Sequence, residues 1–232
     1  PDTWQDFHYT CTGTYTNGDY VVNCHDGVAH GELDIYGILG MSCNGAFDTI
    51  AQTLNSTKWQ KLAEDFGYNQ SDRSQVDFPY KKSHFDIASD DSVWSRMQLA
   101  IGQGTTTVTP LLNLMMYAAI ANDGVMMTPY LVDHYLDADG NVVEQTKPKA
   151  LRSVCTKAEA ELMDEFLTYV ITNGTAAAGG SQYARVSGKT GSAQYDSTKN
   201  YHAWFCGYGT NDVSEIAVCV MIEKGGAGGI VA

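Results

Sequence analysis

The sequence has 232 residues, of which 44% are hydrophobic and 18% charged, which suits one compact globular unit with a sizeable core. The formal net charge is −13 and no run of Lys or Arg occurs, so the basic footprint of a nucleic-acid-binding protein is missing. The most apolar stretches, 111–121 and 216–222, are shorter than the roughly 18–20 residues of a membrane-spanning helix. The chain begins at Pro1 without an initiator Met, which we interpret as an excision boundary.

The first 30 residues are rich in turn formers. Aromatic side chains alternate there with Thr, Gly, Asn and Asp, which predicts loops and short strands. Cys11 and Cys24 stand on either side of Asn17-Gly18, a strong signal for a two-residue hairpin turn. Three states are compatible with this pair: a disulfide, two packed free thiols, or a Zn²⁺ site. We favour the first two, because the spacing matches no recognised zinc motif. The other candidate zinc ligands are His25, Asp26 and His30.

An amphipathic helix is predicted after residue 44. The apolar residues at 46, 47, 50, 51 and 54 recur at helical spacing, so one face should be buried. Asn44 is the expected N-cap, because its side chain can accept hydrogen bonds from the free N–H groups of the first turn. Residues 65–95 are polar and irregular, and we interpret them as a surface excursion.

The ends of two further helices are marked in the sequence. One is a core helix that begins at Thr109-Pro110, with Thr as N-cap and Pro at the first helical position, and runs to Ala121. The other opens with the capping-box pattern Thr156–Glu159 and ends near 173–174.

Strand-like runs close the sequence, and tight turns separate them, so antiparallel pairing of neighbours is the simplest topology. These runs are 185–194, 201–208 and 216–222. Residues 137–141 predict another hairpin turn between two modest strands. Helices followed by an antiparallel meander indicate an α+β fold, with an antiparallel sheet flanked by helices and a helical subdomain. We divide the chain into a loop and hairpin region at 1–30, a helical part at 31–124, and a helix plus sheet at 125–232.

The stretch Met41-Ser42-Cys43-Asn44 stands directly before the first predicted helix. In the plain structural interpretation, Asn44 only caps that helix. In the functional interpretation, Ser42 offers a hydroxyl for proton transfer and Asn44 offers an amide for a substrate carbonyl. Both can hold, because a capped helix would fix the loop rigidly.

The stretch 187–193 begins the first strand of the meander and sets a cation, a hydroxyl and a glycine side by side. Gly191 lacks the Cβ that would keep a ligand away from the strand. The competing interpretation is an edge strand that Lys189 protects from pairing. The stretch 101–110 has Gly-Gln-Gly before a helix but lacks the Lys and the spacing of a phosphate-binding loop, so nucleotide binding is not expected.

Taken in order, these stretches resemble the transpeptidase domain of penicillin-binding proteins. The resemblance rests on Ser-x-Asn at 42–44, Gly-Gln-Gly…Thr-Pro-Leu at 102–111 and Lys-Thr-Gly-Ser-Ala at 189–193. It runs from about Cys11 to the C-terminus. The motifs Ser-x-x-Lys, Ser-Asp-Asn and Lys-Thr-Gly are signatures of these proteins and of related β-lactamases. The Gly-Gln-Gly stretch is more similar to monofunctional, class B members than to β-lactamases.

The resemblance implies a role for each matching residue. Ser42 would relay a proton toward the leaving group, and Asn44 would hydrogen-bond the substrate's peptide backbone. Lys189 would supply positive potential beside the nucleophile. Thr190 would contact the substrate carboxylate, and the backbone N–H of Ser192 would be one of two oxyanion-hole donors. The expected substrate-binding residues are thus Thr190, Gly191 and Ser192, and no metal or cofactor is expected.

The family's nucleophile is missing from the sequence, because none of the ten lysines has Ser three positions before it. We expect Ser-x-x-Lys to precede residue 42 in the parent protein and a last helix to follow residue 232, so the fold would be incomplete at both ends. The parent would be a peptidoglycan D,D-transpeptidase that cross-links stem peptides through a serine acyl-enzyme. The 232 residues alone would be inactive.

Partners and location also follow from the resemblance. Stem peptides ending in D-Ala-D-Ala and β-lactam antibiotics would bind, other cell-wall synthesis proteins would be partners, and nucleic acid would not be one. The site would lie on the extracytoplasmic face of the bacterial plasma membrane, with any anchor in a missing N-terminal part. The alternative is a non-catalytic family member or a penicillin-sensing module. The absence of Ser-x-x-Lys from the full reading frame would favour this alternative. A β-lactamase, which hydrolyses its acyl group, is a weaker match.

Overall fold

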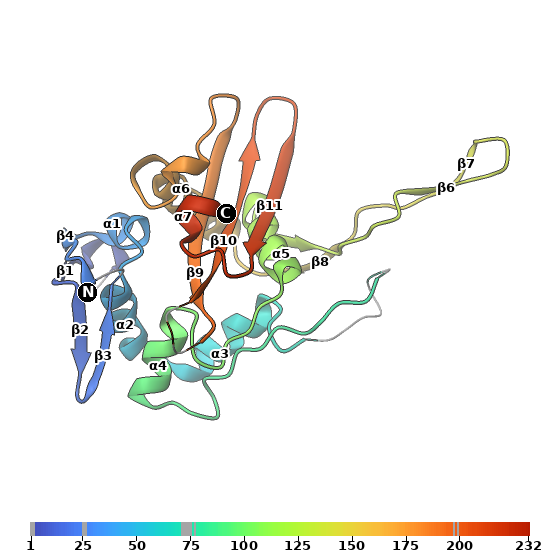
Figure 1. The fold of residues 1–232 in the computed structure, drawn as a ribbon. Helices are drawn as coiled ribbons and strands as arrows, with labels where there is room; N and C mark the ends of the chain where they lie inside the picture. The colour runs from blue at the N-terminus through green and yellow to red at the C-terminus, as the bar shows by residue number, and fades with distance from the viewer. Residues whose placement is uncertain (1–2, 25–26, 71–75, 77, 197, 199) are drawn as a thin grey trace.

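The computed structural model describes residues 3–24, 27–70, 76, 78–196, 198 and 200–232. Its centre is an antiparallel sheet in the order β11-β10-β9, formed by β9 (Arg185–Gln194), β10 (Tyr201–Thr210) and β11 (Glu215–Ile222). The predicted meander is therefore confirmed (Figure 1). The strand that carries Lys189, β9, lies at the edge of this sheet.

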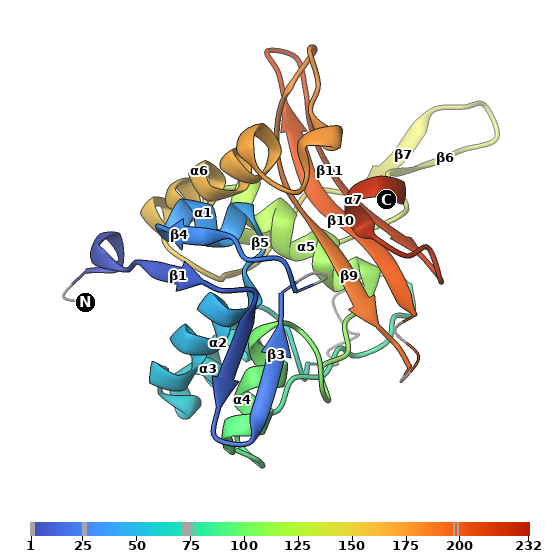
Figure 2. The ribbon, with the colours of Figure 1, turned by 60° about the vertical axis from the view of Figure 1, so that its left-hand side comes forward.

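Helices cover both faces of the sheet. Figure 2 shows α5 (Pro110–Ala121) and α6 (Lys157–Asn173) on one side of it and the short α7 (Gly228–Val231) on the other. After α6, a single 3-10 turn, η3 (Ala177–Gly179), leads toward β9. Apolar side chains from the end of α6 meet Phe205 of β10 in one of the core clusters, so the sheet is anchored to this helix.

The N-terminal part combines two small sheets with four helices. The sheets pair β1 (Tyr9–Cys11) with β4 (Gly31–Leu33), and β2 (Thr14–Asn17) with β3 (Tyr20–Asn23). The second pair is the predicted hairpin, but its two turn residues are 18 and 19, one position beyond the predicted 17 and 18. A 3-10 turn, η1 (Trp4–Asp6), precedes them. The helices are α1 (Ile35–Gly40), α2 (Asn44–Thr53), α3 (Ser56–Asp65) and α4 (Val93–Ala100).

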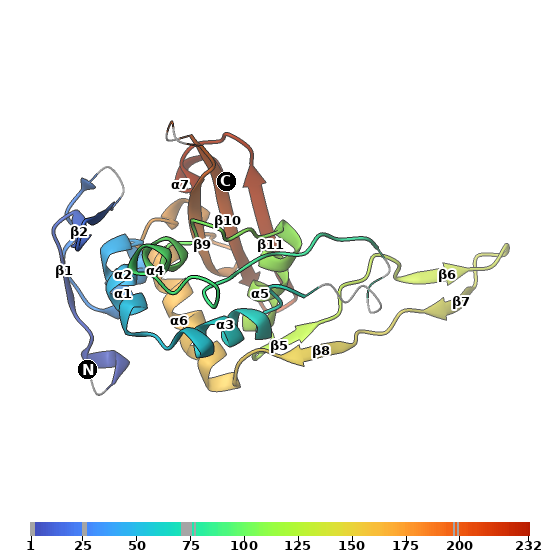
Figure 3. The same ribbon diagram turned by 90° about the horizontal axis from the view of Figure 1, so that it is seen from below.

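A long hairpin projects from the body of the molecule (Figure 3). At its base β5 (Val125–Met127) pairs with β8 (Ala150–Ser153), and further out β6 (His134–Leu136) pairs with β7 (Val142–Gln145). The predicted turn at 137–141 joins β6 to β7, where one carboxylate oxygen of Asp137 accepts a hydrogen bond from the backbone N–H of residue 141.

The end signals of α5 and α6 are confirmed. The Thr109 hydroxyl accepts from the backbone N–H of Leu112 at 3.1 Å, and Pro110 opens the helix. At α6 both halves of the capping box between Thr156 and Glu159 are formed. Within the part of the chain that the structure describes, no helix is both long enough and apolar enough to cross a membrane.

The predicted helix after residue 44 is present, but its N-cap is Cys43 and not Asn44. Asn44 is the first helical residue, and its side-chain amide donates to the carbonyl oxygen of Asn23 at 2.8 Å. The prediction was wrong because the helix begins one residue earlier than expected, and the Asn44 side chain bonds a partner on β3 that is distant in sequence. Sequence spacing does not reveal such a partner.

The segment 65–95 is not wholly a surface excursion. Phe85 and Ile87 are buried, and together with Leu99 they form a small core cluster. The Gln60 side chain donates to the carbonyl of Phe85 and accepts from the N–H of Ile87, which satisfies the irregular backbone there. Phe85 and Ile87 are only two alternating apolar residues, too few to predict a buried element from periodicity.

The end of α1 lies against the end of α6 at two glycines. The backbone N–H of Thr175 donates to the carbonyl oxygen of Gly40 at 3.0 Å. A Cβ on Gly174 would lie 2.4 Å from that same oxygen, and a Cβ on Gly40 would lie 2.8 Å from the ring of Tyr169. Only residues without a side chain allow this approach, which holds the α1–α2 loop beside the sheet.

We expect Gly174→Ala to lower the free energy of unfolding by about 2–3 kcal/mol, the upper part of the range for overpacking, because a backbone carbonyl blocks the new methyl group. Urea denaturation measures the change. Gly180→Ala is the matched control: its Cβ would have only ordinary contacts, at 3.4 Å and beyond. Equal stabilities of the two variants would contradict the close approach.

Candidate active site

Ser42 and Lys189 meet in the structure although 147 positions separate them in the chain. The Lys189 ammonium donates to the Ser42 hydroxyl oxygen at 3.1 Å and to the carbonyl oxygen of Thr190 at 2.9 Å. The hydroxyl comes from the loop between α1 and α2, and the amine comes from the edge strand β9. The packing of α1 on α6 therefore brings two of the sequence-predicted residues into direct contact.

The Lys189 side chain is largely removed from solvent. Among the described residues, no carboxylate lies within ion-pair distance of its amine. Burial therefore lowers the pKa of Lys189 to about 8. Near neutral pH this amine can both hold a proton and release one, so the Ser42–Lys189 pair is suited to proton transfer.

Ser42 occupies a position where glycine is usual. The N–H of Cys43 bonds the carbonyl of Ile38 and the N–H of Ser42 bonds the carbonyl of Leu39, the pattern of a Schellman motif that ends α1. Ser42 has a φ of 53°, in the left-handed region. A non-glycine residue there costs on the order of 1 kcal/mol or more, so its hydroxyl is retained at a cost to stability.

Asn44 has a different environment from Ser42 and Lys189. Its amide nitrogen is engaged by the carbonyl of Asn23 on β3, which leaves the amide oxygen as its available polar atom. Among the described residues, no hydrogen bond joins Asn44 to Ser42 or Lys189. The structure thus places Asn44 one residue beyond the buried Cys43, next to the serine in sequence but directed at the hairpin.

The predicted substrate-binding residues follow Lys189 along β9. The Thr190 hydroxyl lies 3.1 Å from the hydroxyl of Thr175, which comes just after α6. The Ser192 hydroxyl accepts from the backbone N–H of Gly228 at 3.1 Å, so α7 begins against this strand. A Cβ on Gly228 would lie 2.2 Å from the carbonyl oxygen of Gly191. Paired hydroxyls next to a cation can bind a carboxylate.

Sequence reasoning missed a buried polar network beneath β9. Asp164 of α6 accepts hydrogen bonds from Ser187 and Tyr208, both at 2.7 Å, and forms an ion pair with Arg185 at 2.6 Å. Burial alone would raise the pKa of Asp164, but these partners outweigh it and lower the pKa. The network fixes β9 just before Lys189. The helical pattern of α6 gave no signal for it, since one acidic residue among several has no distinctive spacing.

The Gly-Gln-Gly stretch supports the other end of β9. With its amide oriented to match, the Gln103 side chain pairs with both backbone groups of Gln194, at 3.2 Å and 3.3 Å. A cavity of about 350 Å³ lies between α5 and the paired strands β5 and β8. Neither Ser42 nor Lys189 lines this cavity. The contact between Ser42 and Lys189 therefore lies at the sheet edge, outside that cavity.

The N-terminal cysteines form a cluster and not a disulfide. The sulfurs of Cys11 and Cys24 are 3.5 Å apart, and Cys43 joins them with its sulfur 3.8 Å from that of Cys24. Hydrogen bonding with Cys43 opposes burial and lowers the pKa of Cys24. The predicted alternative ligands His25 and Asp26 lie outside the described residues. Sequence spacing gives no signal that Cys43 contacts the other two cysteines, because the contact forms only when α2 packs beside the hairpin.

Comparisons with known proteins identify the fold. A solved structure of the D,D-transpeptidase domain of a peptidoglycan glycosyltransferase from Eggerthella lenta is 28% identical, with a TM-score of 0.86 over 95% of this chain and 56% of that one. The penicillin G acyl-enzyme complex of penicillin-binding protein A from M. tuberculosis is 20% identical, with a TM-score of 0.84 over 98% of this chain and 54% of that one. The fold is thus that of a transpeptidase domain.

Sequence comparison extends this result. Residues 3–232 match the family model for the penicillin binding protein transpeptidase domain, and the chain belongs to this family. The peptidoglycan D,D-transpeptidase PbpA of Mycolicibacterium smegmatis is 28% identical over 189 residues, which cover 80% of this chain and 38% of that protein. The chain therefore spans well under half of the length of this curated relative.

The buried Lys189 amine gives a pH-dependent prediction. An unfolded chain keeps the ordinary lysine pKa near 10.4, so between about pH 8 and 10.4 it binds more protons than the folded protein. Burial of the charged amine lowers the free energy of unfolding near neutral pH. This free energy therefore rises as the pH increases from about 8 to 10.4. We expect Lys189→Met to raise the free energy of unfolding at pH 7 and to flatten its rise above pH 8.

Urea denaturation at several pH values measures both effects. Lys58→Met, at an exposed position on α3, controls for the loss of a lysine and should leave the slope in place. An unchanged slope in Lys189→Met would show that the amine is not desolvated in the folded protein.

Proposed function

We propose that these residues supply the Ser-x-Asn and Lys-Thr-Gly parts of the active site of a peptidoglycan D,D-transpeptidase. The 3.1 Å contact between Lys189 Nζ and Ser42 Oγ carries the proposal, because it joins two motifs that such an enzyme needs in one place. PbpA of M. smegmatis bears the name of a D,D-transpeptidase, and the M. tuberculosis structure is a penicillin G acyl-enzyme. Since the chain spans only part of these proteins, the activity of the whole protein is inferred from this part.

The nucleophile in this proposal is a serine on a Ser-x-x-Lys motif from outside the 232 residues, none of whose lysines follows a serine at that spacing. Its oxygen attacks the carbonyl carbon of the penultimate D-Ala, an ester bond forms and the amide bond to the terminal D-Ala breaks. The departing amine takes a proton. In the second step the amine of a neighbouring stem peptide attacks the ester, a new amide forms and the serine is regenerated.

Each residue of the site has a part in these steps. Ser42 passes a proton to the departing amine, and Lys189 holds that proton path at positive potential with a pKa close to the working pH. Thr190, paired with Thr175, binds the terminal carboxylate of the substrate. The amide oxygen of Asn44 accepts from the peptide N–H of the stem.

Two further substrate contacts belong to β9. The backbone N–H of Ser192 serves as one oxyanion-hole donor, and Gly191 leaves room beside the strand for the substrate. β-Lactams acylate the same serine in this proposal, and the site lies on the extracytoplasmic face of the bacterial plasma membrane, among other cell-wall synthesis proteins. The competing function is a penicillin sensor, which would be acylated without transferring the acyl group to an amine.

The test uses the protein that includes the Ser-x-x-Lys motif, with a fluorescent penicillin and a denaturing gel. Thr190→Val should slow acylation by about 10- to 100-fold, because it removes a hydrogen bond to a charged group worth roughly 1.5–3 kcal/mol. Thr16→Val, an exposed threonine on strand β2, is the matched control and should react at the unmodified rate.

The 232 residues alone should remain unlabelled, because they lack an acyl acceptor and half of the oxyanion hole. A stoichiometric covalent band on them would refute the assignment of the nucleophile. Release of D-Ala from a stem-peptide mimic, with transfer to an added amine, separates the enzyme from the sensor. Acylation without such transfer would support the sensor.

A further inference from the structure

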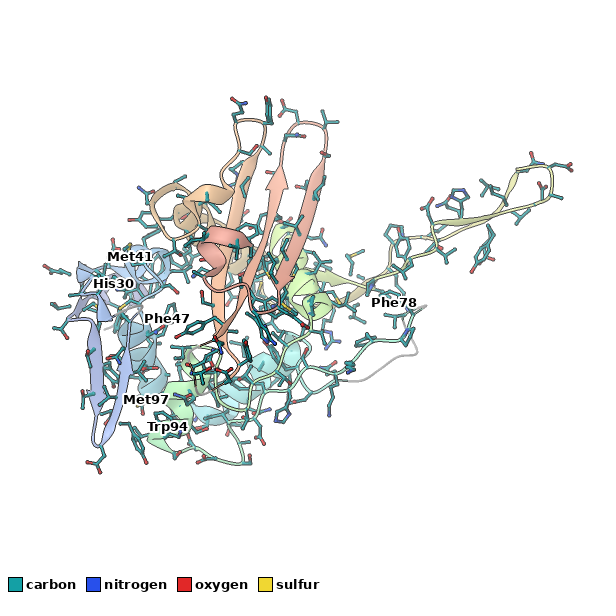
Figure 4. All side chains as sticks on the ribbon, in the orientation of Figure 1. His30, Met41, Phe47, Phe78, Trp94 and Met97 are labelled. Carbon is teal, nitrogen blue, oxygen red and sulfur yellow. The ribbon has the colours of Figure 1, made fainter. Side chains whose placement is uncertain are left out.

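Four potential metal ligands converge beside the Ser42 loop from four separate segments. They are Cys11 at the end of β1, Cys24 after β3, His30 before β4, and Cys43 between α1 and α2. Their three sulfurs and one ring nitrogen all lie within 4.8 Å of one another. Figure 4 shows His30 and Met41 at the N-terminal end of the molecule, beside α1.

The distances match a tetrahedral ion of the size of zinc. With Zn–S near 2.3 Å and Zn–N near 2.0–2.1 Å, ligand atoms stand roughly 3.5–3.8 Å apart. The Cys11–Cys24 and Cys24–Cys43 sulfur separations are 3.5 and 3.8 Å. A disulfide would instead draw one pair of sulfurs to about 2.05 Å and leave the third sulfur and the histidine unused.

One polar atom of the cluster, the ring nitrogen Nδ1 of His30, is buried without a partner among the described residues. The cysteines are at most 3% exposed, and the backbone N–H of Gly13 donates to the Cys11 sulfur at 3.4 Å, as it would to a metal-bound thiolate. Buried polar atoms normally have a hydrogen-bond partner, so an unpartnered imidazole nitrogen on a ring that lies against three sulfurs points to a bound ligand.

We propose that Cys11, Cys24, Cys43 and His30 bind one Zn²⁺ ion that holds the Ser42–Asn44 loop in place. Three thiolates and one imidazole are soft enough to select zinc over magnesium or calcium. They fill all four tetrahedral positions, so the site is structural and leaves no open position for a substrate. The ion is separate from the serine chemistry.

The ion acts on the loop through Cys43. This ligand lies directly between Ser42, whose left-handed φ of 53° is costly, and Asn44. The Asn44 amide also bonds the carbonyl of Asn23, the neighbour of Cys24, so the two segments are joined twice. Zinc would thus tie the β2–β3 hairpin to the loop and keep the Ser42 hydroxyl within reach of Lys189.

Metal content tests the binding. The purified protein, expressed with zinc in the medium, should contain about one zinc per chain by mass spectrometry of the elements, and Cys43→Ser should lose most of it. Cys155→Ser, a half-buried cysteine outside the cluster, is the matched control and should keep the metal. A wild-type protein without zinc, or a Cys43→Ser protein that keeps the full amount, would overturn the site.

If Cys43→Ser fails to fold, cobalt replaces the variant as the probe. Co²⁺ added to metal-stripped wild-type protein should give the intense thiolate-to-metal absorption and the visible bands of a tetrahedral sulfur-rich site. Added Zn²⁺ should abolish them. Weak bands of octahedral cobalt alone would refute the proposed ligand set.

The positioning role rests on the proposed function and has its own readout. Removal of zinc by a chelator should slow acylation of the Ser-x-x-Lys-containing protein by a fluorescent penicillin at least 10-fold, and added zinc should restore it. An unchanged rate in zinc-free protein would overturn the positioning role. Zinc bound at one per chain in a protein that penicillin never labels would refute the proposed function and leave the metal site standing.

Discussion

The close approach of α1 to the end of α6 is the constraint on which the site depends. Because Gly40 and Gly174 lack side chains, the carbonyl of Gly40 can accept a hydrogen bond from Thr175. That bond fixes the loop carrying Ser42 on one side. On the other side, Thr175 contacts Thr190 on the edge strand. A backbone contact of two small residues thus aligns two motifs that are far apart in the sequence.

The electrostatics of the site depend on this alignment. Lys189 is enclosed with a hydroxyl and a carbonyl as its partners, so its charge is poorly compensated and the pKa falls to about 8. Beneath the strand, the Asp164 network is satisfied by several donors and remains charged. The desolvated amine and the left-handed backbone of Ser42 therefore lower the free energy of unfolding, and the surrounding packing offsets this loss.

Elements with local signals could be predicted from the sequence, and contacts between distant segments could not. The caps of α5 and α6 and the turns of the β9–β11 meander depend on residues within a few positions, so they were found. The bond from the Asn44 amide to Asn23 and the contact of Cys43 with Cys24 had no such signal, because folding brings together segments that are separate in the sequence. Ser42 and Lys189 were both named as site residues only through a family resemblance, because spacing alone does not connect their motifs; their contact is a finding of the structure.

A double-mutant cycle on the acylation rate is the most direct test of the central claim, that Ser42 and Lys189 act as one unit. The rates are those of the Ser-x-x-Lys-containing protein with penicillin, for wild type, Ser42→Ala, Lys189→Ala and the double variant. We expect strong coupling, with the double variant no slower than the slower single variant, as for residues that share one function. Effects that multiply, so that the coupling free energy is close to zero, would contradict it.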